Sequence, residues 1–119
     1  MKSNVLIVDD ETGIRDLFTY ILEPLGYKVT SVCDGVECIE LLNSQQFDII
    51  FLDIHMPRLN GIETLREIKK MDPNQKVVVM TSSSDPSGRA EKEAKDSFSV
   101  SVIEKPFGLD EIVGFIEND

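Results

Sequence analysis

Short runs of apolar residues alternate along the chain with stretches whose apolar residues recur every three or four positions. Three runs, 5–8, 49–52 and 77–80, are uninterrupted and rich in β-branched residues, as expected for strands covered on both faces. Two further runs, 28–32 and 99–103, mix polar with apolar residues, which is typical of edge strands. The pattern therefore predicts three central strands and two edge strands.

The stretches between these runs predict helices. Apolar stripes at helical spacing comprise Ile14, Leu17, Phe18, Ile21 and Leu25, then Cys38, Ile39 and Leu42, then Ile62, Leu65 and Ile68, and finally Leu109, Ile112, Val113 and Ile116. Gly26 is suited to end the first helix, and Pro24 predicts a kink or an early stop there. The stretch 87–98 has only Ala90 and Ala94 as an inner face before Phe98, so this helix should bury little.

Regular alternation of strand and helix predicts one doubly wound α/β domain over residues 1–119. Placing the three apolar strands at the centre gives a five-stranded parallel sheet of order 2-1-3-4-5, the flavodoxin-like arrangement of a (βα)5 domain. The length of 119 residues suits one domain with one core.

Charge and composition narrow the possible partners. The net charge of −10 argues against direct nucleic-acid contact by this domain, and it suits cation binding or a basic partner. No apolar run reaches the roughly 18 residues of a membrane span, and the first residues do not resemble a signal peptide. We therefore expect a cytoplasmic protein without membrane contact. Cys33 and Cys38 are expected to be small buried or half-buried thiols rather than a disulfide or a metal site.

Polar residues follow four of the predicted strands. Asp9 and Asp10 follow the first strand, Asp53 the third, Thr81 the fourth and Lys105 the fifth. Taken singly, each has a plainer explanation: an aspartate in a turn or helix cap, a threonine with β propensity, a lysine on the surface. In an open α/β sheet, however, the carboxyl ends of the strands meet where the strand order reverses. Their coincidence at one edge favours a functional site.

Electrostatics indicate what such a site would bind. Two carboxylates about 4 Å apart repel by roughly 4 kcal/mol at an effective dielectric constant near 20. Relief comes from protonation, from Lys105 or from a cation, and oxygen ligands at few positions suit Mg²⁺. A carboxylate beside Mg²⁺ and a lysine is also a possible nucleophile toward phosphorus. Thr81 would then hydrogen-bond one phosphoryl oxygen.

Four segments, "VLIVDDE", "IIFLDIHMPRLNGIE", "VVVMTS" and "VIEKPF", resemble in order and spacing the signatures of the response-regulator receiver domain (CheY-like) of two-component signalling. The resemblance implies that Asp53 accepts a phosphoryl group from a histidine kinase or a histidine phosphotransfer protein. It implies a Mg²⁺ site, with Mn²⁺ as a substitute, formed by Asp10, Asp53, the backbone carbonyl of His55 and, through water, Asp9.

The same resemblance implies further roles. Thr81 would be the switch hydroxyl and Lys105 the phosphate-contacting lysine, with a cis bond to Pro106. Residues 60–61, Asn-Gly, would form the turn into the third helix. The protein would be a signalling protein and not an enzyme, beyond catalysing its own phosphoryl transfer and autodephosphorylation. It would act on a downstream effector or output domain through the surface around the fourth helix, fifth strand and fifth helix.

Three positions depart from the family pattern. The aromatic residue usually found three positions before the lysine is replaced by Val102. Ser82 stands where alanine is usual, and Phe98-Ser99 where the family has a glycine-alanine pair. All three departures lie near the expected output surface.

His55 is the only histidine of the chain. A hard Mg²⁺ site gives little reason for imidazole ligation, so we expect the side chain at the rim of the pocket. There it would tune the access of water to the phosphoryl group and thus the lifetime of the signal.

Three other functions compete with a phosphorylatable signalling domain. A phosphohydrolase of the haloacid-dehalogenase type would need Asp-x-Asp where this chain has "DIH". A flavodoxin-like FMN binder would need a phosphate loop where the chain has the acidic "DDETG". A pseudo-receiver, acting as a docking module without regulation by phosphorylation, is favoured only by the altered output surface.

Overall fold

The computed structural model describes residues 4–55, 60–82, 88–98 and 100–117, with the side chain of Ala90 left aside. The elements follow in the order β1 (Asn4–Val8), α1 (Thr12–Leu22), the 3-10 turn η1 (Glu23–Leu25), β2 (Lys28–Val32), α2 (Gly35–Leu42), β3 (Ile49–Asp53), α3 (Gly61–Met71), β4 (Val77–Thr81), α4 (Arg89–Phe98), β5 (Ser101–Glu104) and α5 (Leu109–Glu117). The predicted alternation of strand and helix is confirmed.

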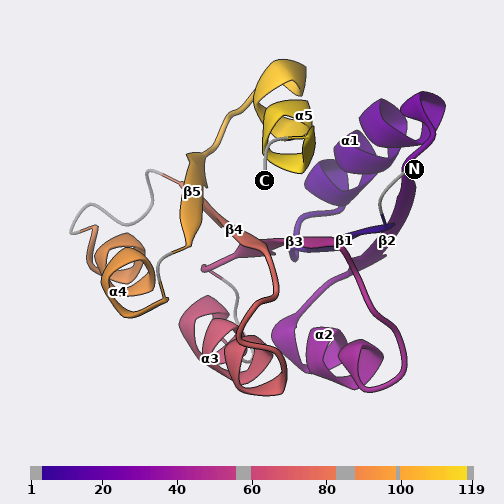
Figure 1. Ribbon diagram of the computed structural model, residues 1–119. Coiled ribbons are helices and arrows are strands. Elements are labelled where there is room, and N and C mark those ends of the chain that lie inside the picture. The colour runs from indigo at the N-terminus through magenta and orange to yellow at the C-terminus, as the bar shows by residue number, and fades with distance from the viewer. Residues whose placement is uncertain (1–3, 56–59, 83–87, 99, 118–119) are drawn as a thin grey trace.

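The strands form one parallel sheet of order β2-β1-β3-β4-β5, as predicted. Helices α1 and α5 cover one face of the sheet, whereas α2 and α3 cover the other and α4 lies beside β5 (Figure 1). All residues of β3 and β4 are buried, while β2 and β5 have exposed positions. The strands predicted to be central are therefore the more buried ones, and the two predicted edge strands lie at the edges of the sheet.

Two strands extend one residue beyond their apolar runs. Asp53 pairs with Met80, and Thr81 pairs with Glu104, so both polar residues belong to the sheet rather than to the loops after it. The backbone ladder continues through them because its hydrogen bonds do not depend on side-chain polarity. The last strand begins at Ser101 instead of residue 99, and residue 99 lies outside the described residues.

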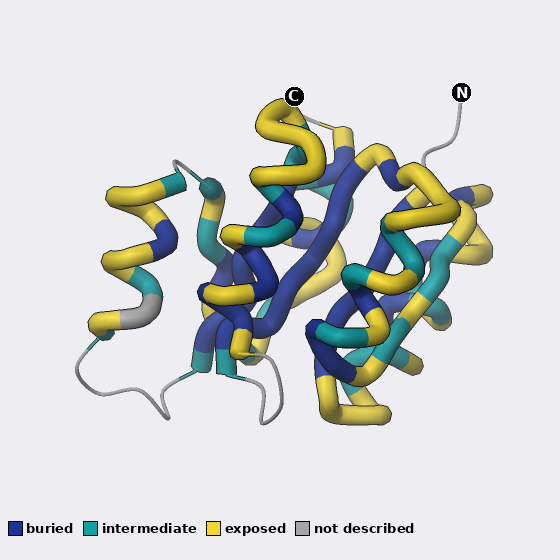
Figure 2. The backbone as a smooth tube through the Cα atoms, turned by 90° about the horizontal axis from the view of Figure 1, so that it is seen from below, coloured by how far each residue is buried: buried dark blue, intermediate teal, exposed yellow. Residues whose placement is uncertain are grey.

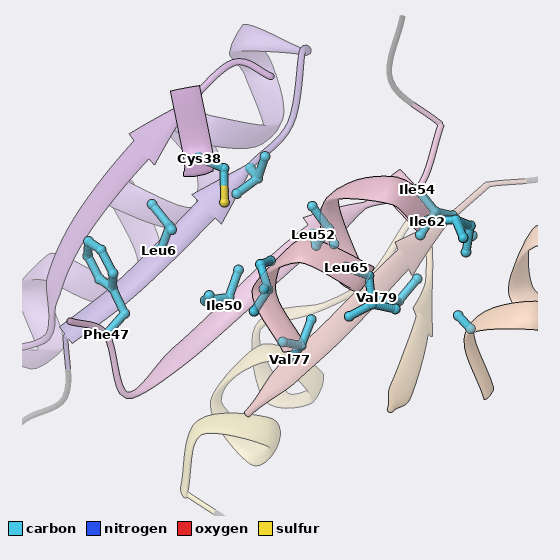
Figure 3. Packing of buried hydrophobic residues seen from close by; sticks show 13 residues of the cluster. Leu6, Cys38, Phe47, Ile50, Leu52, Ile54, Ile62, Leu65, Val77 and Val79 are labelled. Carbon is cyan, nitrogen blue, oxygen red and sulfur yellow. The ribbon is translucent and has the colours of Figure 1, made fainter. Parts of the chain in front are cut away.

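Alternate residues of each central strand point to opposite faces and build two apolar clusters. Apart from Asn4 at the start of β1, the residues of the central strands are buried, and exposed residues lie on the outer sides of the helices (Figure 2). One cluster joins Leu6, Ile50, Leu52 and Val79 to residues of α2, α3 and α4 (Figure 3). The other joins strand residues to α1 and α5, and includes Phe18 and Phe51, whose ring centroids lie 4.9 Å apart.

The end of α1 shows the effect of Pro24. The α-helix ends at Leu22 and continues as the 3-10 turn η1, because proline cannot donate the next helical hydrogen bond. Gly26 then adopts a φ of 95°, the left-handed conformation that glycine tolerates best, and closes the turn. The predicted early stop is therefore confirmed.

Two smaller expectations have different outcomes. Among the described side chains of α4, Ala94 is fully buried and Phe98 is half-buried, so this part of the helix buries little, as predicted. Both cysteines are free thiols; Cys38 is buried, but Cys33 is exposed, contrary to the expectation of a buried or half-buried thiol. It lies just beyond the edge strand β2, and its Sγ donates to Oε1 of Glu37 on α2 at 3.0 Å. Within the described ranges, no helix is both long and apolar enough to cross a membrane.

Candidate functional site

The candidate site lies at the carboxyl ends of the strands, beside the point where the strand order reverses between β1 and β3. Asp9 directly follows β1, and its backbone N–H donates to the carbonyl of Val32 at the end of β2. Asp53 is the last residue of β3. The backbone N–H of Lys105, which follows β5, donates to the carbonyl of Thr81 on β4. The sheet therefore places all the predicted strand-end residues at one edge.

The ammonium group of Lys105 joins three carboxylates at this edge. Its Nζ lies 2.8 Å from Oδ2 of Asp9, 3.1 Å from Oε1 of Glu11 and 3.3 Å from Oδ2 of Asp53. The side chain of Lys105 is only 12% exposed, and those of Asp9 and Asp53 are 0% and 5% exposed. This arrangement answers why a buried strand ends in a charged residue: the Asp53 carboxylate is paired with a buried cation.

Both oxygens of the Asp53 carboxylate have hydrogen-bond donors that fix its orientation. Its Oδ1 accepts a hydrogen bond of 2.8 Å from the backbone N–H of His55, while Oδ2 faces Lys105. The backbone N–H of Ile54, the next residue, donates to the carbonyl of Met80 and continues the pairing of β3 with β4. The carboxylate therefore sits on a rigid sheet edge with a fixed orientation, which is what a nucleophile at this place would require.

The start of α3 packs against the end of β3 and restricts the position of its backbone. Asn60 caps α3 by accepting a hydrogen bond from the backbone N–H of Glu63, as the resemblance implied for the turn. Gly61, the first residue of α3, packs directly on the backbone after Asp53. A Cβ atom at this position would lie 2.0 Å from Cα of Ile54 and 2.7 Å from the carbonyl oxygen of Asp53. Only glycine permits this contact.

The carboxylates form a group that suits a divalent cation. Asp9, Asp10, Glu11 and Asp53 each place one oxygen within 4.8 Å of the others. Asp10 is exposed, so its carboxylate is accessible from solvent, whereas Asp9 and Asp53 are buried. An all-oxygen donor set with an open side fits Mg²⁺, which retains water ligands and accepts phosphate oxygens. The residues present therefore fit the predicted ion.

Burial dominates the electrostatics of Asp9. It raises the pKa of this carboxyl from 3.8 to about 6, and the nearby charge of Asp53 acts in the same direction, while hydrogen bonds from Lys105 and Glu11 oppose it. Burial alone would lower the pKa of Lys105. The hydrogen bond to Asp9 and the negative charges of Asp53 and Asp9 outweigh burial and raise that pKa above its ordinary value. Lys105 is therefore a permanent cation at neutral pH.

The remaining predicted residues take varied positions. Thr81 is buried at the end of β4, but no hydrogen bond joins its hydroxyl to Asp53. The Lys105–Pro106 peptide bond is cis, as the resemblance implied. Val102 is half-buried and packs against the cluster beneath α3 and α4, so this position belongs to the packed interior of β5.

His55 lies two residues beyond Asp53, and its side chain is partly shielded from solvent. The residue is half-buried, and its Nε2 is shielded from solvent without a hydrogen-bond partner within the described ranges. Its backbone N–H donates to the Asp53 carboxylate, a contact in addition to the role that the resemblance implied for its backbone carbonyl. The main chain is available here because β3 ends at Asp53.

Sequence reasoning missed two residues of the site. Arg15 on α1 donates from Nη1 to the carbonyl of Asp9 at 2.7 Å and from Nη2 to Oγ1 of Thr12 at 3.1 Å, and so fixes the segment that carries the acidic pair. Glu11 pairs with Lys105. The acidic run "DDE" was a signal for Glu11, but the sequence did not show which way its side chain turns. No sequence signal singled out Arg15.

The fold defines a doubly wound α/β domain with a cluster of carboxylates at the carboxyl edge of its sheet. The chain belongs to the family described as "Response regulator receiver domain", whose model matches residues 5–117. This family serves signalling, normally binds Mg²⁺ and typically carries a phosphoaspartate, and its proteins interact with histidine kinases and output domains. The predicted family is therefore confirmed.

Curated relatives support this assignment. The chain is 32% identical over 114 residues to Sporulation initiation phosphotransferase F of Bacillus subtilis, covering 94% of this chain and 89% of that protein. It is 32% identical over 113 residues to Response regulator MprA of Mycobacterium ulcerans, covering 95% of this chain. The chain spans about half of MprA, 48% of its length.

Solved structures agree on the fold. NtrX from Brucella abortus has a TM-score of 0.88 and 32% sequence identity, with coverage of 98% of this chain and 26% of that chain. The CheY-like receiver domain protein from Methanospirillum hungatei has a TM-score of 0.89 and 26% identity, with coverage of 98% and 92%. Chemotaxis protein CheY4 of Vibrio cholerae, at 23% identity and a TM-score of 0.86, confirms the fold alone.

Proposed function

We propose that residues 1–119 form one receiver domain that accepts a phosphoryl group on Asp53 in a Mg²⁺-dependent reaction. The observation that carries this proposal is the position of Lys105, whose ammonium contacts the buried carboxylates of both Asp53 and Asp9. Lys105 pairs with the Asp53 carboxylate, and the carboxylates of Asp10 and Asp9 lie beside it. The family supports the proposal, because its members typically carry a phosphoaspartate.

The proposed reaction is a direct transfer between two nucleophiles. A carboxylate oxygen of Asp53 forms a bond to phosphorus while the bond between phosphorus and the donor nitrogen of a phosphohistidine breaks. The electron pair of that bond remains on the donor nitrogen, and because the other ring nitrogen of the phosphohistidine carries a proton, the imidazole leaves as the neutral base. The ammonium of Lys105 stands where it would neutralise charge on the transferred group.

The metal would be held by Asp10, Asp53 and the backbone carbonyl of His55, with Asp9 acting through water; Mn²⁺ would substitute for Mg²⁺. When bound, the ion would neutralise phosphoryl oxygens and align them for attack. The exposed Asp10 carboxylate suits direct ligation, whereas Asp9 is engaged by Lys105 and by the backbone N–H of Glu11. Arg15 supports this set by holding the carbonyl of Asp9.

The proposed output runs through Thr81 and the surface of α4, β5 and α5. Thr81 would turn its hydroxyl toward the phosphoryl group, and its backbone bond to Lys105 joins β4 to the segment after β5. The phosphoryl donor would be a histidine kinase or a histidine phosphotransfer protein. The partner that responds to the phosphorylated chain would be a downstream effector or output domain. Val102 offers no aromatic ring, so we propose that repacking of α4 replaces a ring rotation.

Acetyl phosphate with Mg²⁺ tests the reaction directly. Intact-protein mass spectrometry should show one added phosphoryl group on the wild-type chain and none on Asp53→Asn. The matched control is Asp48→Asn, a change of the same chemistry at the opposite edge of the sheet, which should keep the added group. A wild-type chain that remains unmodified, or an Asp53→Asn variant that still gains the group, refutes the proposal.

A docking module without phosphorylation is the second candidate, and Val102 is the observation that favours it. In that case the chain would bind its partner equally well with and without a phosphoryl group. The same partner tested against the phosphorylated chain and Asp53→Asn separates the two functions: equal affinities support the docking module, and unequal affinities support the phosphorylation-dependent receiver.

A further inference from the structure

Glu11 has an unusual position at the start of α1. It occupies the N-cap of the helix, yet its side chain makes no capping hydrogen bond. Its Oε1 lies instead 3.1 Å from Nζ of Lys105, on the segment that follows β5. Its backbone N–H donates to Oδ1 of Asp9 at 2.9 Å. The side chain of Glu11 thus reaches from the start of α1 to Lys105 at the solvent-exposed side of the site, which we call its mouth. The backbone of the same residue is bound to the Asp9 carboxylate.

The three carboxylate partners of Lys105 differ in how readily they release it. The ammonium of Lys105 donates hydrogen bonds to Glu11 and Asp53, and it forms an ion pair with Oδ2 of Asp9 at 2.8 Å. The side chain of Glu11 is 62% exposed, while that of Asp9 is fully buried. Water can replace the lysine at Glu11 at little cost, but not at Asp9. Of the three partners, Glu11 is therefore the one that Lys105 can leave at the least cost.

We propose that Glu11 is a positioning residue that holds the Lys105 ammonium toward the mouth of the site in the unphosphorylated chain. This inference rests on the proposed function of Asp53. A phosphoryl group on Asp53 would draw Lys105 away from Glu11, and the freed carboxylate would face a second negative charge. Glu11 thereby opposes phosphorylation by anionic donors in two ways, by occupying Lys105 and by repelling the donor.

Removing the charge of Glu11 should therefore speed phosphorylation. For Glu11→Gln we expect the initial rate with acetyl phosphate at saturating Mg²⁺ to rise roughly three- to tenfold, the effect of one charge a few ångströms from an anion near a protein surface. Saturating Mg²⁺ is needed because the variant also loses one carboxylate beside the metal ligands. The increase should shrink as salt rises, because salt screens exposed charges. A purely structural role would not produce this salt dependence.

Two further variants control the experiment. Glu11→Asp keeps the charge and should stay near the wild-type rate. Glu23→Gln makes the same change of net charge in η1, beyond the far end of α1, and should leave the rate unchanged. The inference is overturned if Glu11→Gln is no faster than wild type at saturating Mg²⁺, or if Glu23→Gln is equally accelerated.

A double-mutant cycle tests the contact without any phosphorylation. In metal-free denaturation, Glu11→Gln should leave the unfolding equilibrium of the wild-type chain unchanged or shift it toward unfolding. In a Lys105→Met background the same change should shift it toward folding, because Glu11 then only repels Asp9 and Asp53. Lys105→Gln serves where Lys105→Met does not fold.

We expect the two effects of Glu11→Gln to differ by at least about twofold in the unfolding equilibrium constant. If the effects of Glu11→Gln and Lys105→Met on the unfolding equilibrium are additive, Glu11 and Lys105 do not interact and the proposed contact is refuted. A wild-type chain that takes no phosphoryl group would instead refute the proposed function of Asp53, and the cycle would still decide whether Glu11 holds Lys105.

Discussion

The ammonium of Lys105 lies 3.3 Å from Oδ2 of Asp53, although 52 positions separate the two residues in the chain. The sheet makes this contact, because β4 stands between β3 and β5 and carries both strand ends to the same edge. Around it the site holds more acidic than basic groups. That imbalance leads to the first two predictions.

Mg²⁺ should stabilise the folded chain by relieving repulsion among Asp9, Asp10 and Asp53. At a concentration about 20 times the dissociation constant, the expected gain in unfolding free energy is about 1.8 kcal/mol. Thermal or chemical denaturation with and without Mg²⁺ measures it. Asp10→Asn should lose most of the gain, and a wild-type melting point indifferent to millimolar Mg²⁺ would contradict the assigned pocket.

The metal-free chain should lose stability through Asp9 as pH rises. The pKa of Asp9 is about 6 in the folded chain against 3.8 ordinarily, so between these values the folded state binds the proton more tightly than the unfolded state. The contribution of Asp9 to stability therefore falls as pH rises from about 4 to about 6, by roughly 2–3 kcal/mol.

Asp9→Asn should remove this dependence. In the presence of a chelator, we expect the variant to be more stable than wild type by about 2 kcal/mol near pH 7.5 and by much less near pH 4.5. Denaturant titrations at both values measure the difference. Asp16→Asn, at an exposed aspartate of α1, should follow the wild-type profile. The same advantage of Asp9→Asn at both pH values would contradict the role of its buried charge.

Gly61→Ala should be strongly destabilising, by roughly 3 kcal/mol or more, because a Cβ at this position would lie 2.0 Å from Cα of Ile54. The control is Gly13→Ala in α1, where a Cβ would meet nothing within 4 Å and should stabilise the helix by about 0.5–1 kcal/mol. Chemical denaturation compares the two. Equal effects would show that α3 does not hold the backbone after Asp53.

His55→Ala should shorten the lifetime of the phosphoryl group on Asp53. The half-buried ring lies two residues from the carboxylate, and its removal would admit water to the site. His55→Lys, which restores bulk, should lengthen the lifetime relative to His55→Ala. Mass spectrometry after removal of the phosphodonor follows the decay of the phosphoryl group. An unchanged lifetime in both variants would show that the His55 side chain does not limit the access of water.

Local signals were sufficient for the elements and for much of the site. The apolar runs predicted the central strands because strands covered on both faces need apolar residues at every position. Pro24 and Gly26 predicted the end of α1 through their backbone restrictions. Asp9, Asp53 and Lys105 were found because parallel strands bring their carboxyl ends to one edge, so that topology converts sequence position into proximity.

Other features depended on side-chain directions that no local pattern encodes. The sequence by itself determined the strand order and the identities of the strand-end residues, because burial periodicity and chain connectivity constrain both. Only the tertiary structure decided that Lys105 is shared among Asp9, Glu11 and Asp53, that Arg15 holds the acidic segment and that Cys33 is exposed. These outcomes depend on distances of a few ångströms between segments far apart in the chain, and packing alone sets such distances.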